Sequence, residues 1–66
     1  MKISKRKIEL IMAQKFASVS ELAKLSGVSR QNISTVVRRG TCRPLTAAKL
    51  ARALGVDPAD IIEEED

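Results

Sequence analysis

Residues 18–40 place the strongest constraint on the fold, because two helix-start signals lie there with a single glycine between them. Ser18 and Glu21 have the spacing of a capping box, in which a serine and the glutamate three residues later satisfy each other's backbone amides. Gly27 follows the apolar positions and is the residue that most readily ends a helix in a left-handed conformation. Ser29 then stands where a second helix needs its N-cap. The stretch predicts two short helices joined by a tight turn, at residues 19–26 and 30–38.

The second of these predicted helices has one apolar and one polar face. Ile33, Val36 and Val37 have the i, i+3, i+4 spacing of one helix side. At about 100° per residue, the opposite arc of roughly 140° holds five polar residues and no carboxylate: Arg30, Gln31, Ser34, Thr35 and Arg38. Arginine and glutamine can form bidentate hydrogen bonds to guanine and adenine edges in the major groove. An ordinary solvated face would normally include Glu or Asp, so the pattern favours contact with DNA bases.

These residues resemble a known family. The spacing is similar to the helix-turn-helix of phage repressors, Cro proteins and their bacterial relatives, the lambda-repressor-like group: Ser18-x-x-x-Leu22-Ala23-x-x-x-Gly27-Val28-Ser29-x-x-x-Ile33-Ser34. Two later segments also resemble this group, Arg39-Gly40 and Ala51-x-Ala53-Leu54-Gly55-Val56. The similarity covers about residues 6–62. Ser26 departs from the pattern, because many relatives have leucine there, and a small residue at that place also resembles the Lac-repressor type of helix-turn-helix.

The resemblance implies a sequence-specific regulator of transcription that binds double-stranded DNA. Its base contacts are expected from helix 30–38, at Arg30, Gln31 and Thr35, with Ser34 and Arg38 behind them. Phosphate contacts are expected from the start of helix 19–26 and from the loop after helix 30–38. The residues expected at phosphates are Ser18, Ser20, Ser29, Arg39 and Arg43. A repressor that binds a palindromic operator as a homodimer is the specific expectation.

Charge is distributed unevenly along the chain. Twelve Lys and Arg against eight Asp and Glu give a net charge of +4, and six of the eight acids lie from Asp57 onward. Residues 1–56 therefore hold twelve bases and two acids, a net charge of +10. This asymmetry is typical of a protein that binds a polyanion and has an acidic tail. An acidic membrane surface is a weaker alternative, because no predicted helix combines a basic face with bulky aromatic anchors.

A first helix is predicted from the N-cap Ser4 to about residue 15, after a frayed start at residues 1–4. Its apolar side has helical spacing, and these residues are expected in the core: Ile8, Ile11, Met12 and Phe16. Phe16 is the only aromatic residue and is expected to fill the middle of the bundle. Leu10 falls off this side and is expected at the surface.

A fourth helix is predicted to begin at Pro44 and to end at Gly55. Its core stripe is Ala47, Leu50, Ala51 and Leu54. Asp57, Pro58 and Asp60 then fit an N-cap, N1 and N3, which predicts a short fifth helix at residues 58–63. The fold class is thus all-α, five short helices in one domain of residues 1–62, followed by a mobile acidic tail of residues 63–66. Ile61 or Ile62 is expected to remain outside the core and to form the dimer interface.

Several function classes are disfavoured. The chain has no His, Tyr or Trp, and it offers no nucleophile–base pair and no Cys/His cluster, so we expect no enzyme, metal or cofactor. Binding of single strands usually needs exposed aromatic residues, whereas Phe16 is expected inside. The second hypothesis is an antitoxin or anti-repressor, a protein-interaction module that also binds DNA to regulate its own synthesis.

The single cysteine, Cys42, cannot form an internal disulfide, and we interpret it as a small filler in a reducing cytoplasm. The longest apolar run is residues 10–13, which is too short to span a membrane, and no signal peptide is evident. A cytoplasmic protein is expected. The initial methionine and the acidic end favour a whole protein over a fragment.

Overall fold

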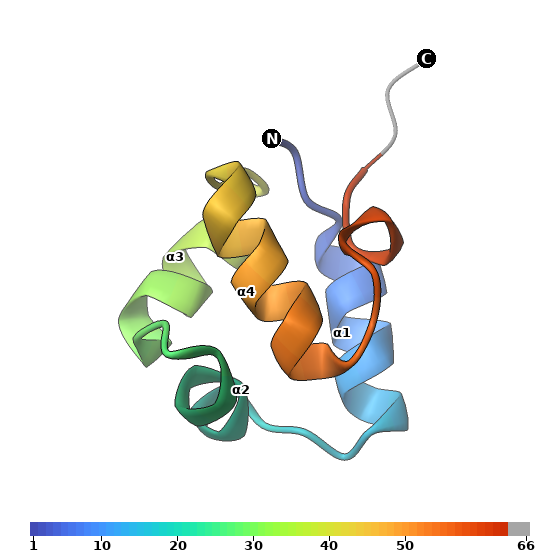
Figure 1. Cartoon of the computed structure of the whole chain (residues 1–66), viewed down its shortest axis with the longest axis vertical. Coiled ribbons are helices and arrows are strands. Elements are labelled where there is room, and N and C mark those ends of the chain that lie inside the picture. The colour runs from blue at the N-terminus through green and yellow to red at the C-terminus, as the bar shows by residue number, and fades with distance from the viewer. Residues whose placement is uncertain (64–66) are drawn as a thin grey trace.

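Four α-helices and one short 3-10 turn follow one another in the computed structural model, which describes residues 1–63 (Figure 1). They are α1 (Lys5–Gln14), α2 (Val19–Ser26), α3 (Arg30–Arg39), α4 (Pro44–Leu54) and η1 (Pro58–Asp60). This confirms the all-α class. The helix bounds agree with the predicted ones to within a residue for the first four elements.

The predicted helix caps set these bounds. Ser4, Ser18 and Ser29 each accept a hydrogen bond from the backbone amide three residues later, over 3.1–3.2 Å. Each such cap satisfies an amide that has no partner within the helix, which stabilises a helix by about 1 kcal/mol. The Glu21 side chain has no hydrogen bond to another described residue, so the capping box predicted at Ser18 is only half formed.

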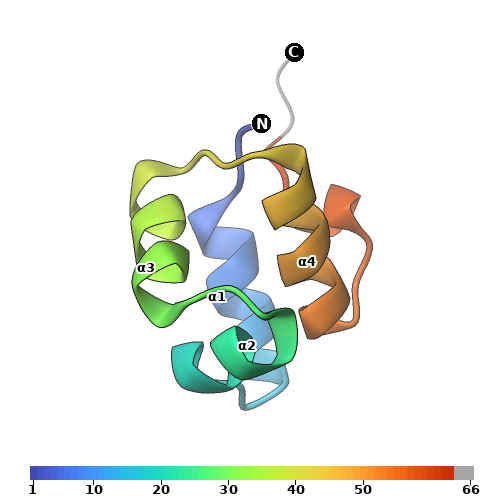
Figure 2. The same ribbon diagram turned by 60° about the vertical axis from the view of Figure 1, so that its left-hand side comes forward.

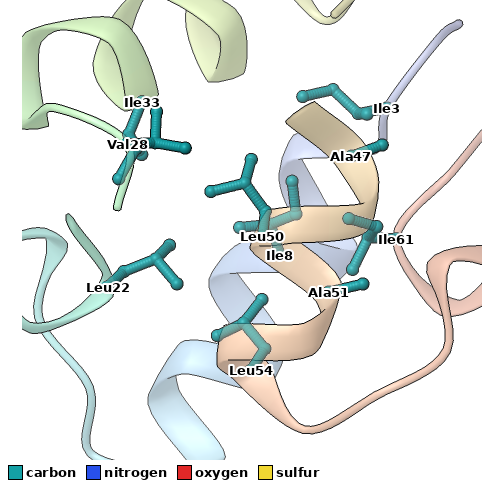
Figure 3. Packing of buried hydrophobic residues seen from close by; sticks show 10 residues of the cluster. All are labelled: Ile3, Ile8, Leu22, Val28, Ile33, Ala47, Leu50, Ala51, Leu54 and Ile61. Atoms are coloured by element: carbon teal, nitrogen blue, oxygen red, sulfur yellow. The ribbon is translucent and has the colours of Figure 1, made fainter. Parts of the chain in front are cut away.

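α4 supplies the largest share of the core. Four of its side chains are fully buried: Ala47, Leu50, Ala51 and Leu54. The α2–α3 unit packs against one side of α4 through Leu22, Val28 and Ile33 (Figure 3). Three further buried residues complete the cluster: Ile3, Ile8 and Ile61. No polar or charged side chain is buried among residues 1–63, so packing of apolar surface stabilises this fold.

Phe16 is not in the core, contrary to the prediction. Its side chain is 92% exposed, and its φ of 55° is left-handed. α1 ends at Gln14, so the helical spacing that relates Phe16 to Ile8 no longer applies. The amides of Phe16 and Ala17 instead bond to the carbonyls of Ala13 and Met12, over 3.3 and 2.9 Å. This is a Schellman motif, with phenylalanine at the position usually taken by glycine.

The predicted fifth helix is also wrong beyond its first turn. The capping box is present, because Ala59 N donates to Asp57 Oδ1 over 2.9 Å and Asp57 N donates to Asp60 Oδ2 over 3.1 Å. The turn stops after Asp60, and the chain continues as an extended segment that pairs with Ile3.

Residues 1–4 are ordered by pairing, so the expectation of a frayed start is wrong. The Ile3 side chain is 1% exposed, and its amide donates to the Gly40 carbonyl over 2.9 Å. Glu63, expected in the mobile tail, donates its amide to the Lys2 carbonyl over 3.1 Å. The rest of the expected tail, residues 64–66, lies outside the described residues.

Candidate nucleic-acid interface

The turn between α2 and α3 is fixed by three features. Gly27 has a φ of 74°, and a Cβ atom there would meet nothing within 4 Å, so glycine is favoured by backbone conformation alone. The Val28 side chain is buried beneath the turn. Ser26 accepts a hydrogen bond from the Val28 amide over 3.1 Å. A leucine could not make this bond, so Ser26, where the chain departs from the family pattern, has a structural role.

α3 presents the two faces that its sequence predicts. Ile33 is 1% exposed, while Val36 and Val37 are half-buried against the core. On the other side, four polar residues are exposed: Arg30, Gln31, Ser34 and Arg38. These four are among the side chains expected at base edges, and the cap at Ser29 holds the first two in the opening turn.

Thr35 differs from its neighbours on this face. It is half-buried, and its hydroxyl donates to the Gln31 carbonyl over 2.8 Å. The hydroxyl is therefore occupied within the helix, which leaves the methyl group as the part that can contact a base.

The basic residues of this surface have no acidic partners within reach. No carboxylate of residues 1–63 lies within ion-pairing distance of Arg30, Arg38, Arg39 or Arg43. An ion pair does occur on α1, where Lys5 Nζ lies 4.0 Å from a Glu9 oxygen on the exposed surface. The positive potential around α3 is thus not cancelled locally, which favours the approach of a polyanion.

A shallow groove lies beside α3, between this helix and the start of α4. Its polar lining comes from Asn32, Thr35, Arg39, Thr41, Arg43 and Thr46. Arg43 is the N-cap residue of α4 and makes no side-chain cap bond, and Pro44 at the first helical position has no amide, so the amides of Leu45 and Thr46 are left without a side-chain cap. Free amides at a helix start and two arginines are suited to bind phosphate.

Asn32 is one of three polar residues of this groove that the sequence interpretation missed, with Thr41 and Thr46. It falls between the apolar and polar arcs of α3, so neither face included it. Its spacing to Thr35, Val36 and Arg39 is i+3, i+4 and i+7, which places the four residues on one stripe. That stripe could have been recognised from the sequence.

The three serines expected at phosphates, Ser18, Ser20 and Ser29, are exposed at the starts of α2 and α3. Ser18 and Ser29 use their oxygens as caps, which leaves each hydroxyl hydrogen available. Ile61 is 0% exposed within its own chain, so of the two candidates for the dimer interface it is the one enclosed in the core. Ile62 is half-buried and keeps surface for a partner.

Cys42 is half-buried in the loop and packs against the core, as expected of a small filler. Burial raises the pKa of its thiol. In the part of the chain that the structure describes, no group of three His, Cys, Asp or Glu side chains could hold a metal ion. The helices of residues 1–63 are all too short, or too polar, to cross a membrane.

Comparison with known proteins agrees with this geometry. The family model of the Cro/C1-type HTH DNA-binding domain matches residues 7–66. No curated protein and no solved structure matches the chain. The family match includes α2, the turn at Gly27, α3 and the loop between α3 and α4, and it begins after residues 1–6. The chain therefore belongs to the Cro/C1-type helix-turn-helix family of DNA-binding domains that regulate transcription.

Proposed function

We propose that the protein is a repressor that binds a palindromic operator as a homodimer, with α3 in the major groove. The observation that supports this most strongly is the exposed α3 face, where Arg30, Gln31 and Ser34 have no carboxylate beside them. A buried Ile33 directly beneath this face anchors it to the core.

Base contacts come from the opening turn of α3. Arg30 favours a guanine and Gln31 an adenine, because each can form two hydrogen bonds to that base, worth ~1–3 kcal/mol of discrimination. Thr35 contributes its methyl group, which fits against a thymine methyl, since its hydroxyl bonds the Gln31 carbonyl. Ser34 and Arg38 extend the contact along the helix.

Phosphate contacts come from the rim of this face and fix the register without specifying sequence. The groove beside α3 binds consecutive phosphates of one DNA strand through Asn32, Arg39 and Arg43. The capped starts of α2 and α3 bind a second run of phosphates through Ser18, Ser20 and Ser29, where helix dipoles favour an anion.

One helix in one groove is a small interface, so two copies on half-sites about 34 Å apart are required for tight binding. Ile62 is the proposed dimer contact, because Ile61 is enclosed within its own chain. A dimer on an operator near a promoter would block transcription by occupying the site.

Two substitutions separate base contacts from phosphate contacts. Gln31→Ala should lower discrimination between the selected duplex and a scrambled one by about 5- to 150-fold. Arg43→Ala should weaken binding to both duplexes alike and reduce the slope of log K against log salt by about 0.9. Arg52→Ala is the matched control, because Arg52 is exposed in the C-terminal half of α4 and lines a hollow beside the end of α2, not the groove beside α3.

Fluorescence anisotropy titrations at three or more salt concentrations give all of these quantities. The control should leave the slope and the discrimination unchanged. Equal losses for Gln31→Ala and Arg43→Ala on both duplexes would refute the division between base and phosphate contacts.

A further inference from the structure

Residues 1–4 form an extended segment, here called the N-terminal segment, that pairs with two distant parts of the chain. On one edge, Ile3 N donates to Gly40 O over 2.9 Å, and Cys42 N donates to Met1 O over 3.0 Å. On the other edge, Ser4 N donates to Ile61 O over 2.7 Å, and Glu63 N donates to Lys2 O over 3.1 Å. The segment thus lies between the α3–α4 loop and the C-terminal segment (Figure 1).

The α3–α4 loop, residues 40–43, depends on this pairing. Its other backbone bonds are to the two helices that it joins, Gly40 N to Val36 O and Ala47 N to Arg43 O. Within residues 1–63, the backbone bonds of the loop to any distant part of the chain are those to the N-terminal segment. The loop crosses the same end of the molecule as that segment (Figure 2).

The paired loop residues lie directly between the two arginines of the phosphate groove. Arg39 precedes Gly40, and Arg43 follows Cys42, so each arginine is next to a residue whose backbone bonds to the N-terminal segment. Met1 also lines the groove with Asn32 and both arginines. Arg39 is the last residue of α3 and Arg43 is the N-cap of α4, so a shift of the loop backbone would change the position of Arg43 and of the end of α3 that carries Arg39.

We propose that the N-terminal segment is a positioning element that holds Arg39 and Arg43 in the geometry for DNA phosphates. The inference rests on the proposed DNA contact of these arginines. It concerns residues that precede the family match, which begins at residue 7.

Ile3 is the residue that fixes this element. Its side chain is 1% exposed in the core beside α4, while its own amide bonds the loop carbonyl of Gly40 (Figure 3). Burial of one side chain thus holds the backbone of the loop in place. Truncating Ile3 should release the segment, after which the arginines would have to be ordered during DNA binding.

Ile8 provides a matched control within the same core. Its side chain is also 1% exposed, and it belongs to α1, which makes no backbone bond to the loop. Ile3→Ala and Ile8→Ala remove the same atoms from equally buried positions. Any difference in DNA binding between the two variants therefore depends on where the isoleucine lies in the fold, and not on the loss of apolar burial alone.

The test measures binding of the full chain to the selected and scrambled duplexes across a salt series, at a temperature where circular dichroism shows both variants folded. Ile3→Ala should weaken binding to both duplexes by about 10-fold, which is the effect of losing one hydrogen bond to a charged group. Its salt slope should fall by about 0.9 for each of the two arginines that no longer reaches a phosphate, with discrimination between the duplexes unchanged. Ile8→Ala should keep the wild-type salt slope, because Ile8 lies in the core beside Ile33 and not at the phosphate groove.

If either alanine variant is unfolded, the same comparison uses Ile3→Val and Ile8→Val with amide hydrogen exchange. Exchange at Cys42 and Glu63, whose amides bond the N-terminal segment, should be faster in Ile3→Val and unchanged in Ile8→Val.

Equal slopes and affinities for the alanine pair, or equal exchange rates for the valine pair, would overturn the positioning role. Failure of the wild-type protein to bind any duplex would instead refute the proposed function, on which the inference rests. The two failures are therefore distinguishable.

Discussion

Replacing Phe16 by glycine should stabilise the fold, although phenylalanine was expected at the centre of the core. Phe16 occupies the left-handed position after α1, with a φ of 55°, and its side chain is 92% exposed. A left-handed conformation costs a residue other than glycine roughly 1–2 kcal/mol. Glycine removes this strain at the only place in residues 1–63 where a residue other than glycine has a positive φ.

The expected magnitude combines three terms. A phenylalanine with so little contact buries on the order of 15 Å², worth ~0.4 kcal/mol. The greater freedom of glycine in the unfolded chain costs about 0.4–1 kcal/mol. Subtracting both from the strain leaves Phe16→Gly more stable than wild type by about 0.5 kcal/mol. Phe16→Ala keeps the strain and loses the contact, so it should be less stable than wild type by ~0.4 kcal/mol.

Urea unfolding of the three proteins, followed by circular dichroism, measures these differences. The gap between the glycine and alanine variants should be about 1 kcal/mol, which corresponds to about 4–8 °C in Tm for a domain of this size. Truncation of a core phenylalanine to alanine lowers the free energy of unfolding by about 3–5 kcal/mol. A loss of that size in Phe16→Ala, with glycine no better, would refute the exposed left-handed position.

The remaining predictions concern a cap and a thiol. Asp57→Ala should lower the free energy of unfolding by about 1 kcal/mol in the same assay, because it removes the cap of η1. No change in this free energy would mean that the capping box does not stabilise the fold. Because burial raises the pKa of Cys42, the thiol stabilises the fold fully below its unfolded pKa, and this contribution is lost as the pH rises through the higher folded value. The pH midpoint of iodoacetamide alkylation should therefore lie higher in the folded protein than in urea, and a midpoint at or below the urea value would contradict the burial of Cys42.

Local chemistry made most of the fold predictable. Each serine cap and each glycine stop acts within a few residues of its own position, so Ser18, Gly27 and Ser29 could be interpreted without the rest of the chain. The stripe of α4 follows from helical spacing in the same way. These features locate α2, α3 and α4 to within a residue.

The errors arose where a distant segment, or the end of a helix, decides the structure. Residues 1–4 are ordered by backbone bonds to residues about forty and sixty positions away, which no local pattern contains. Pairing of Ile62 with Ile3 likewise ends the expected fifth helix early. Phe16 was assigned to the core because the helical spacing of α1 was extended beyond the end of the helix.

The candidate interface was predictable for a different reason. Assignment of Arg30 and Gln31 to the exposed face requires only the position of Ile33 on the buried one, and the structure agrees. The stripe of Asn32 follows from helical spacing, but the groove that it lines is formed with the start of α4, and that packing is not encoded in α3 alone. The hydrogen bond that occupies the Thr35 hydroxyl depends on a rotamer, which sequence does not specify.

The most direct test of the central claim is methylation interference on a duplex selected from a random pool. Methyl groups at guanine N7 lie in the major groove, and those at adenine N3 lie in the minor groove. If α3 contacts bases through Arg30 and Gln31, N7 methylation should block binding at guanines in two half-sites about one helical turn apart, and Arg30→Ala should abolish that sensitivity at one guanine per half-site. Interference by N3 methylation alone, or a pattern that Arg30→Ala leaves unchanged, would contradict the placement of α3 in the major groove.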